Sequence, residues 1–307
     1  MALISSTELG VRRWFCVKVL QARRPTLDWG AVDVARWHPR LPEFAAGANA
    51  ISLLMPHAEP YVIAQVRAAT IDDQGLRIQS EQWCAQEAAH FRLHRQFNDR
   101  LISTSWLARY LDGVGKWLFA RLTRRSVHFG LAFSAAFELI AYSSARWLDA
   151  NLRSLLMGAD RTAATLFAWH LAEEVEHKAI VHEVLEASQA GSHTKRGTVA
   201  AFLVLIGWTV FAGLALFCST RSALNPLRWV RLISWGFSYA FVLLPLLAAS
   251  SWPGFSPRTL VDPPWMLLWL TEYDSESNTI SSWDEAGLHR LMTHRLTKRR
   301  AQEQEVA

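Results

Sequence analysis

Two segments of the sequence carry a glutamate followed three residues later by a histidine. Glu87 and His90 form the first pair, and Glu174 and His177 form the second. In an α-helix a step of three residues is just under one turn, so both side chains of a pair project from the same face. A carboxylate is rarely buried without a partner, and a divalent metal ion satisfies a carboxylate and a neutral imidazole together. The spacing therefore predicts that both pairs belong to a metal site.

Apolar side chains share the helical faces of both pairs. Trp83 and Phe97 fall on the face of the first pair, and Val181 and Val184 fall on that of the second. Two solvated surface helices would keep such side chains on the face opposite to their charged groups. The pattern therefore favours pairs that face the interior of a helical bundle.

Two further glutamates, Glu59 and Glu138, each stand alone on an apolar helical face. One inward Glu from each of two helices, with a Glu-x-x-His pair from each of two others, is the ligand set of carboxylate-bridged di-iron bundles. For Glu138 the alternative is a lone buried glutamate that is protonated or hydrogen-bonded. For Glu59 it is a carboxylate at a helix N-terminus, stabilised by the macrodipole. Glu173 could replace or supplement Glu174. The step of three residues to His177 favours Glu174.

Three more side chains are expected beside the site, in catalytic or supporting roles. His94 follows the first pair by one turn and is a candidate base, extra ligand or ordinary core histidine. His170 precedes the second pair by one turn and could orient its carboxylate. Tyr142 follows Glu138 by one turn and could donate a hydrogen bond or a proton. Glu176 falls off the stripe and is expected to be solvated.

The sequence predicts an all-α fold: a ferritin-like four-helix bundle with a crossover connection, plus C-terminal hydrophobic helices. Pro56 and Pro60 are placed in the first turn of the first bundle helix, where proline is tolerated. The long connection over 100–126 is expected to break at Gly113 and Gly115. The helices are expected at about 57–69, 76–99, 127–156 and 166–184. The connections then run short, long and short, as in a bundle of two antiparallel hairpins.

Composition divides the chain into four parts. These are an N-terminal arm and lead-in (1–50), the metal-binding bundle (51–190), a hydrophobic helical region (191–260) and a polar tail (261–307). Within the third part, 197–220 and 232–257 contain no charged residue, and each is long enough to span a bilayer. A membrane hairpin and a pair of helices buried on the bundle both remain open. Arginines flank both segments on both sides, so they indicate no orientation.

The overall composition narrows the partners. The chain has 51% hydrophobic residues, 19% charged residues and 15 Trp, which fits apolar ligands or a membrane. The net charge of +5 comes from scattered basic residues, so a nucleic-acid partner is not expected. The N-terminus lacks the apolar stretch of a signal peptide, and the three Cys have no disulfide-like spacing. We therefore expect a cytoplasmic location, with association with the inner membrane as the alternative. The sequence indicates no oligomeric state.

The segments that hold the motifs resemble a known family. They read WHPRLPEFAAGANAISLLMPHAEPYVIAQVR, QEAAHFRLHRQFN, FELIAYSSARWL and WHLAEEVEHKAIVHEVLE. From about Val11 to Ala190 the chain resembles the bacterial proteins described as predicted metal-dependent hydrolases, and it departs from them after Gly191. The resemblance implies a ferritin-like fold and a hydrolytic activity. It implies metal ligands at Glu59, Glu87, His90, Glu138, Glu174 and His177.

The chemistry of the ligand set favours a different reaction. Four carboxylates nearly balance two divalent ions, and their hard oxygens with two imidazoles suit iron, or manganese, better than zinc. The main hypothesis is a di-iron centre that uses O2 and an electron donor to oxidise a small apolar substrate. The first alternative is hydrolysis by a metal-activated water. The second is metal binding without catalysis by a membrane-associated protein.

Overall fold

The structure is a computed structural model that describes residues 20–252, 254–281, 287 and 293. The described part of the chain is all-α, and its one β contact is an isolated bridge between Asp274 and Thr279. In chain order the helices are α1 (Pro42–Arg67), α2 (Gln74–Thr104), α3 (Trp106–Leu122), α4 (Val127–Leu156), α5 (Arg161–His177), α6 (Ile180–Ala187), α7 (Thr194–Cys218), α8 (Pro226–Ser250) and α9 (Pro264–Leu270). Much of the expected N-terminal arm, and nearly all of the polar tail after 281, lie outside the described residues.

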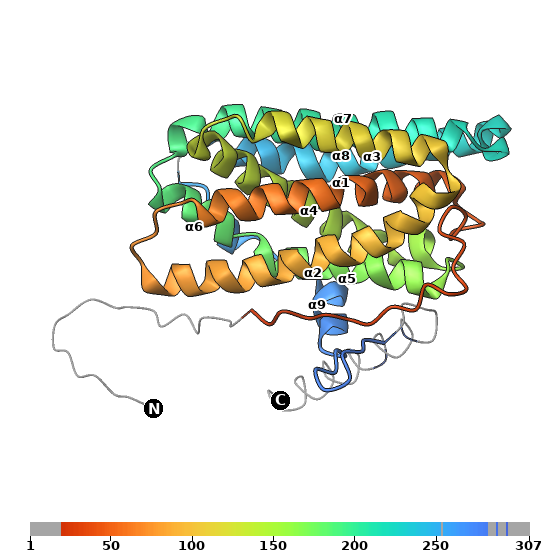
Figure 1. Ribbon diagram of the computed structural model, residues 1–307, viewed down its shortest axis with the longest axis horizontal. Coiled ribbons are helices and arrows are strands. Elements are labelled where there is room, and N and C mark those ends of the chain that lie inside the picture. Colours follow the sequence, from red (N-terminus) through yellow and green to blue (C-terminus); the bar gives the residue numbers. More distant parts are fainter. Residues whose placement is uncertain (1–19, 253, 282–286, 288–292, 294–307) are drawn as a thin grey trace, which may run out of the picture.

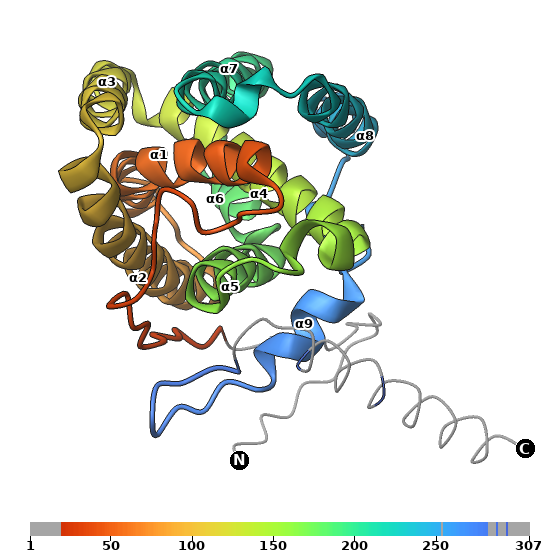
Figure 2. The ribbon, with the colours of Figure 1, turned by 90° about the vertical axis from the view of Figure 1, so that its right-hand side faces the viewer.

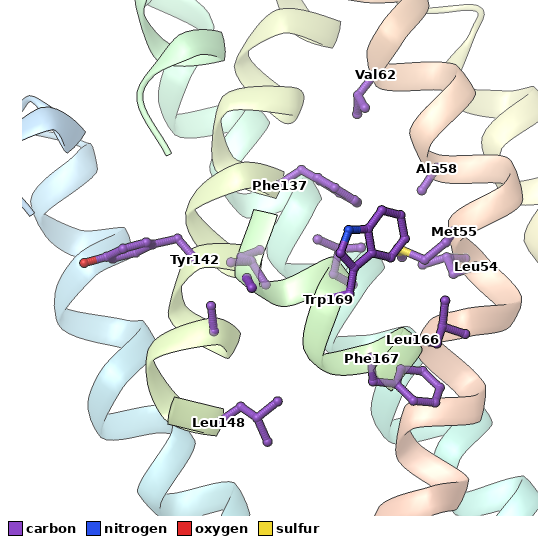
Figure 3. Packing of buried hydrophobic residues seen from close by; sticks show 14 of the residues in the cluster. Leu54, Met55, Ala58, Val62, Phe137, Tyr142, Leu148, Leu166, Phe167 and Trp169 are labelled. Carbon is purple, nitrogen blue, oxygen red and sulfur yellow. The ribbon is translucent and has the colours of Figure 1, made fainter. Parts of the chain in front are cut away.

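Four helices surround the centre of the molecule. Seen end-on in Figure 2, α1, α2, α4 and α5 enclose a common interior. Short turns join α1 to α2 and α4 to α5, whereas α3 lies within the longer connection from α2 to α4. The connections therefore follow the predicted order of short, long and short. The interior is filled by large apolar side chains such as Phe137, Leu166 and Trp169 (Figure 3).

Helix α1 is longer than the sequence predicts. It runs unbroken from Pro42 to Arg67 and holds Pro56 and Pro60 in its interior, so the expected start near residue 57 is wrong. A proline lacks the N–H that would bond to the carbonyl four residues earlier. For Pro56 that carbonyl belongs to Ser52, and the side-chain Nδ2 of Asn98 donates to it instead, at 2.7 Å. A partner from α2 thus replaces the missing bond of α1.

Two other helical expectations are corrected. Helix α3 continues through Gly113 and Gly115, which were expected to break it. A side-chain carbon at Gly115 would lie 3.3 Å from Cδ2 of His57, so this glycine allows a close approach of α3 to α1. The second correction is that the stretch 166–184 is not one helix, because α5 ends at His177 and α6 begins at Ile180. Helix α4 has the predicted bounds.

The two hydrophobic segments form α7 and α8, which cover one side of the bundle. Figures 1 and 2 show α3, α7 and α8 along the same side of the molecule. Helix α7 packs tightly on α4, since a side-chain carbon at Gly197 would lie 2.4 Å from the carbonyl carbon of Ala132. Trp208 of α7 donates a hydrogen bond to the carbonyl of Ala50 in α1, at 2.7 Å. Helix α7 is therefore part of the bundle wall.

Helix α8 is attached along its length by polar contacts. Near its start, Arg228 donates to the buried carboxylate of Glu43 at the beginning of α1, at 2.8 Å. Further along, the Trp147 indole of α4 donates to the hydroxyl of Ser238, at 2.7 Å. Both α7 and α8 are long and apolar enough to cross a membrane, by length and composition alone.

Candidate metal centre

The six side chains predicted as ligands meet in the interior of the four-helix arrangement. They are Glu59 from α1, Glu87 and His90 from α2, Glu138 from α4, and Glu174 and His177 from α5. All six are buried, with at most 1% of any residue exposed. Donor atoms of five of the six, together with His170, form two overlapping groups, each with all atoms within 4.8 Å of one another: Glu87, His90, Glu174 and His177 in one, and Glu59, His90 and His170 in the other.

Glu174 lies between the two histidines and offers one oxygen to each. Its Oε1 is 3.4 Å from Nδ1 of His90, and its Oε2 is 3.5 Å from Nδ1 of His177. Glu87 also reaches both rings, with Oε1 at 2.7 Å from Nδ1 of His177 and 3.7 Å from Nδ1 of His90. Ligands at about 2.1 Å from one octahedral ion lie about 3 Å apart. The spacing of these atoms is thus compatible with ligands that share ions.

The other two glutamates lie at opposite ends of the cluster. Oε2 of Glu138 is 3.7 Å from Nδ1 of His177, whereas Glu59 groups with His90. We call the side with Glu59 and His90 the first half and the side with Glu138 and His177 the second half. Glu59 lies deep inside α1, so the alternative of a carboxylate at a helix N-terminus is wrong.

Most of the donor atoms that face this centre have no hydrogen-bond partner among the described residues. These are both oxygens of Glu59, Glu87 and Glu138, Oε2 of Glu174, and Nδ1 of His90 and His177. The 2.7 Å contact between Oε1 of Glu87 and Nδ1 of His177 lacks hydrogen-bond geometry, so it does not pair these two atoms. A buried polar atom left unpaired costs about 1–3 kcal/mol, and more when it is charged. So many unpaired oxygens and nitrogens around one point are explained by cations that bind there. The residues present therefore fit a metal centre.

Without cations, burial and neighbouring charges shift the pKa values of the carboxyl groups in opposite directions. Burial, reinforced by the charge of Glu87, raises the pKa of Glu59 well above its usual value. Burial and the charge of Glu174 do the same to the pKa of Glu138. Burial also opposes ionisation of Glu174, but the charge of His177 and the nearby nitrogens of the other histidines outweigh it and hold that pKa well below its usual range. Two divalent ions would balance four ionised carboxylates.

Each histidine of the two pairs is held through its other ring nitrogen. Nε2 of His90 donates to Oε2 of Glu173 at 2.9 Å, and Nε2 of His177 donates to Oε1 of Gln86 at 3.0 Å. The Gln86 oxygen accepts because its amide nitrogen donates to the carbonyl of Gln21. A metal ion binds such rings in their neutral form, in which Nδ1 carries the lone pair that faces the cluster. This is how metal-ligating histidines are oriented in proteins.

Glu173 and Glu176 support the cluster rather than enter it. Nη1 of Arg23 donates to both carboxylates, at 2.9 Å each. Glu173 therefore lies beside the cluster, whereas Glu174, which the three-residue step favours, lies between the two histidines. The expectation that Glu176 is solvated is wrong, because only 3% of its side chain is exposed and Arg23 and Gln86 both bond to it.

His170 and His94 form a hydrogen-bonded chain that leaves the first half. Nε2 of His170 lies 3.0 Å from Oε1 of Glu174 and 3.5 Å from Oε1 of Glu59. Its Nδ1 lies 2.7 Å from Nε2 of His94, whose Nδ1 lies 2.8 Å from the hydroxyl of Ser52. His170 thus contacts the carboxylate that it was expected to orient. His94 contacts neither a carbonyl nor a carboxylate through these bonds, so the ordinary core histidine bonded to a carbonyl is excluded.

Tyr142 does not reach the cluster. Its hydroxyl donates to the carbonyl of Val261 at 2.7 Å, and Figure 3 shows the ring pointing away from Trp169. The helical period places Tyr142 on nearly the same face as Glu138, but its hydroxyl is bonded to the segment between α8 and α9 instead of the cluster. The expected role of Tyr142 as a donor at the site is therefore wrong.

Several supporting residues were not predicted from the sequence. Arg23 lies in an irregular segment where no periodicity places its side chain, and Ser52 lies on a helix whose start was misplaced. Gln86 precedes Glu87 directly, and only the buried stripe of α2 offers a signal for it. Asn98 lies one turn after His94 on that stripe, and this spacing could have indicated a buried amide.

An all-α bundle whose interior holds a buried cluster of glutamates and histidines defines a protein that could bind metal ions. The chain belongs to the family described as predicted metal-dependent hydrolases, whose model matches residues 21–260. The match extends through α7 and α8, beyond the limit at Gly191 that the resemblance indicated. No curated protein and no solved structure matches the chain. The family description fits hydrolysis better than oxidation by O2.

Proposed function

We propose that the chain is a hydrolase with a dinuclear metal centre. The observation that carries the proposal is the set of unpaired, buried donor atoms contributed by six residues of four helices. One oxygen of Glu174 faces each histidine, and this arrangement supports one ion in each half with Glu174 between them. Iron is the expected metal, with manganese as the alternative, because oxygen donors outnumber nitrogen donors.

The side chains of this centre have distinct tasks. When bound, the ions would act as Lewis acids and lower the pKa of a water molecule to about 7. Glu87 and Glu174, which lie near both histidines, would hold the ions together with Glu59 in the first half and Glu138 in the second. Glu173 and Gln86 hold the two imidazoles in the tautomer that presents Nδ1 to the centre.

The surroundings support a small apolar ester or amide as substrate. The Trp169 ring packs edge-on against His90 with 4.8 Å between ring centroids, and Trp83 packs against His177 at 6.0 Å. These indoles exclude water from the two histidines. Arg23, which ion-pairs beside the cluster, is already engaged by two carboxylates, so it is poorly suited to bind a phosphate.

A second candidate function is oxidation of an apolar substrate by a di-iron centre with O2 and an electron donor. The donor set favours it, because four carboxylates and two imidazoles suit iron, whereas zinc prefers sites richer in nitrogen or sulfur. The two candidates differ in what turnover needs. Hydrolysis needs water alone, whereas oxidation needs O2 and a reductant.

The test begins with metal content. The full chain in detergent is reconstituted with Fe(II) or Mn(II) without oxygen, and metal per chain is measured beside Glu87→Ala and Glu174→Ala. We expect about two ions per wild-type chain and their loss in both variants. Esters and amides of apolar acids are then assayed with and without O2. Turnover that continues without O2 supports the hydrolase, and turnover that needs O2 and a reductant supports the second candidate. If the wild-type chain bound no metal, both candidate functions would be rejected.

We further propose that the outer face of α3, α7 and α8 binds a lipid bilayer. We call this face the apolar layer. Large apolar side chains on α7 and α8 are exposed, including Phe211, Phe237 and Phe241, the last at 80%. Helix α3 exposes Trp106 and Trp117 beside basic side chains, and aromatic rings with Lys and Arg favour the interface of an anionic membrane.

Contacts within the protein support a layer that lies on the membrane rather than a hairpin that crosses it. Helix α7 could cross a bilayer only together with α1 and α4, against which it packs through Gly213 and Gly197. Helix α2 of the same bundle exposes Arg77, Glu81 and Arg92, and these charges are costly in hydrocarbon. The exposed face of α7 and α8 can instead enter one leaflet, as interfacial helices do.

A further inference from the structure

Hydrogen bonds link His170 through His94 and Ser52 to Asn98, and Asn98 fixes which atom of each bond is the donor. Nδ2 of Asn98 donates to the carbonyl of Ser52 at 2.7 Å, and a carbonyl only accepts. This carbonyl is free because Pro56, four residues later in α1, has no N–H. The amide of Asn98 can therefore have one orientation, with its Oδ1 facing the Ser52 hydroxyl at 2.7 Å.

The direction passes from the amide to the first histidine. Oδ1 of Asn98 accepts only, so the Ser52 hydroxyl gives it its single proton. The hydroxyl oxygen must then accept from Nδ1 of His94, 2.8 Å away. The proton of a neutral His94 is consequently on Nδ1, and its Nε2 carries a lone pair. Burial and the neighbouring His170 lower the pKa of His94 well below its usual value, which agrees with a neutral ring.

The same reasoning fixes the second histidine. Nε2 of His94 accepts, so Nδ1 of His170 donates to it across 2.7 Å. The nitrogen of His170 that can present a lone pair is then Nε2. It lies among Oε1 of Glu174, Oε1 of Glu59 and the ring of His90, whose centroid is 4.3 Å from that of His170.

We propose that Nε2 of His170 is a seventh metal ligand, in the first half of the centre. This inference rests on the dinuclear centre proposed above. A lone pair that faces two carboxylate oxygens is repelled unless a cation lies between them, and both oxygens of Glu59 lack a partner among the described residues. His170, Glu59 and His90 have donor atoms within 4.8 Å of one another, as ligands of one ion must.

The consequence is a centre with two unlike halves. The first half has two nitrogen donors, His90 and His170, whereas in the described residues the second half has His177 alone. An ion with two imidazoles is bound differently from an ion with one, so the two sites should differ in affinity and in spectrum. Ser52, His94 and Asn98 are positioning residues, because they set the tautomer of His170 without touching the ion.

The test titrates the metal-free full chain in detergent with Co(II), against a competing chelator, and records the visible absorption spectrum. Wild type is expected to bind two Co(II) with unequal affinity. In His170→Gln we expect one site to weaken at least 10-fold and its absorption bands to shift, while the other site is unchanged. His182→Gln is the control, since that buried imidazole lies 3.1 Å from the carbonyl of Phe255.

Ser52→Ala tests the tautomer without removing the ligand. His94 then loses the hydroxyl that accepts from Nδ1, so it can carry its proton on Nε2 and force the His170 proton onto the nitrogen that faces the centre. Loss of an outer partner costs about 10–100-fold in metal affinity, and we expect this at the same site that His170→Gln weakens. Ser80→Ala is the matched control, because its buried hydroxyl bonds to the carbonyl of Leu76 in its own helix and, within the described residues, to nothing else.

The outcomes separate this inference from the proposed function. Two Co(II) with the same affinities and spectrum in His170→Gln as in wild type would overturn the seventh ligand and leave the dinuclear centre standing. His170 would then be a donor that hydrogen-bonds Glu174. Equal affinities in Ser52→Ala and Ser80→Ala would overturn the role of the chain behind His170. No Co(II) bound by wild type would overturn the centre and the inference together.

Discussion

At the scale of single residues, the centre concentrates groups that oppose folding. Four carboxyl groups are buried together, and the protein supplies hydrogen bonds to few of their oxygens. Burial raises the pKa of Glu59 and Glu138. Without metal, keeping these two groups ionised in the folded chain therefore costs free energy. Functional sites commonly trade stability for activity in this way.

Glu59→Gln is expected to stabilise the metal-free chain and to abolish the stabilisation that metal gives. The amide cannot ionise, so it removes the repulsion by Glu87 and the burial penalty of a charge, which we expect to be worth about 1 kcal/mol. It also removes an anionic ligand from the first half. Urea unfolding with and without Mn(II) measures both effects.

The control for this experiment is Glu43→Gln. Glu43 is another buried glutamate of α1, but Arg228 and Arg231 pair with it. Breaking that pair should destabilise the protein with or without metal. A loss of stability in metal-free Glu59→Gln similar to that of Glu43→Gln would contradict a role of Glu59 as a ligand.

Arg23→Lys is expected to weaken metal binding in the first half by about 10–100-fold, as changes to outer partners do. The guanidinium holds Glu173 and Glu176 at once, and a lysine cannot reproduce that forked geometry. Glu173 would then hold the His90 ring less firmly. Competition with a chelator measures the affinity, and Arg36→Lys at an exposed ion pair is the control. Equal affinities in the two variants would show that Arg23 does not act on the centre.

The sequence revealed the ligands better than their supports, for a physical reason. The pairs Glu87/His90 and Glu174/His177 lie within single helices, where the helical period itself brings the side chains together. The partners of those side chains come from other segments, and no local period relates Arg23 to Glu173. Tyr142 shows the limit of the same rule, because the helical period places it near Glu138 but its hydroxyl bonds to the carbonyl of Val261 instead.

At the scale of helices, α1 shows how tertiary contacts override a local signal. Taken alone, Pro56 and Pro60 predict that a helix starts near residue 57. In the fold Asn98 bonds to the carbonyl that Pro56 leaves free, so the helix continues. Helix α4 has no such feature, and its bounds follow from its own N-cap at Ser126, whose side chain accepts from the N–H of Phe129.

Helix α7 provides a prediction at this scale, because two of its glycines have opposite surroundings. A side-chain carbon at Gly197 would lie 2.4 Å from the backbone of Ala132, whereas one at Gly207 would have nothing within 4 Å. Gly197→Ala should therefore destabilise the fold by about 1–3 kcal/mol, as overpacking does. Gly207→Ala should stabilise it by up to about 1 kcal/mol, because alanine favours a helix.

Urea unfolding of both variants in detergent measures this difference. Equal effects of the two substitutions would mean that α7 does not pack on α4 in solution. The α7–α8 region would then be a separate hairpin, as one of the two alternatives from the sequence has it.

At the scale of the whole molecule, composition alone could not choose between a membrane hairpin and buried helices. Both need long stretches without charge, and both occur in the sequence. The structure shows a third arrangement, in which one face of α7 is buried on the bundle and its other face, with most of α8, is exposed. A period of buried and exposed residues is hard to read in α7, because both of its faces are apolar.

The apolar layer is expected to bind vesicles of phosphatidylcholine and phosphatidylglycerol. Burying one phenylalanine contributes about 1.5–3 kcal/mol, so the double variant Phe237→Ser and Phe241→Ser should bind at least about tenfold more weakly. Ile78→Ser is the control, since it removes an exposed apolar side chain from α2. Flotation of the vesicles measures binding. Equal binding by the double variant and the control would contradict a membrane role for α8.

Depth within the bilayer distinguishes a layer that lies on the membrane from a hairpin that crosses it. Val230, Phe237 and Phe241 are exposed positions spread along α8. Each is replaced in turn by cysteine in a chain that carries Cys16→Ser and Cys218→Ser and keeps the buried Cys84. The new cysteine is labelled with a fluorophore, which is quenched by nitroxide lipids of known depth. A helix that lies in one leaflet keeps the three labels at similar depth. A spanning helix would separate Val230 and Phe241 by about 1.5 Å per residue along the membrane normal. Since α7 and α8 both contact the bundle, we expect the three labels to lie at similar depths. A steady change in depth from Val230 to Phe241 would instead place α8 across the membrane.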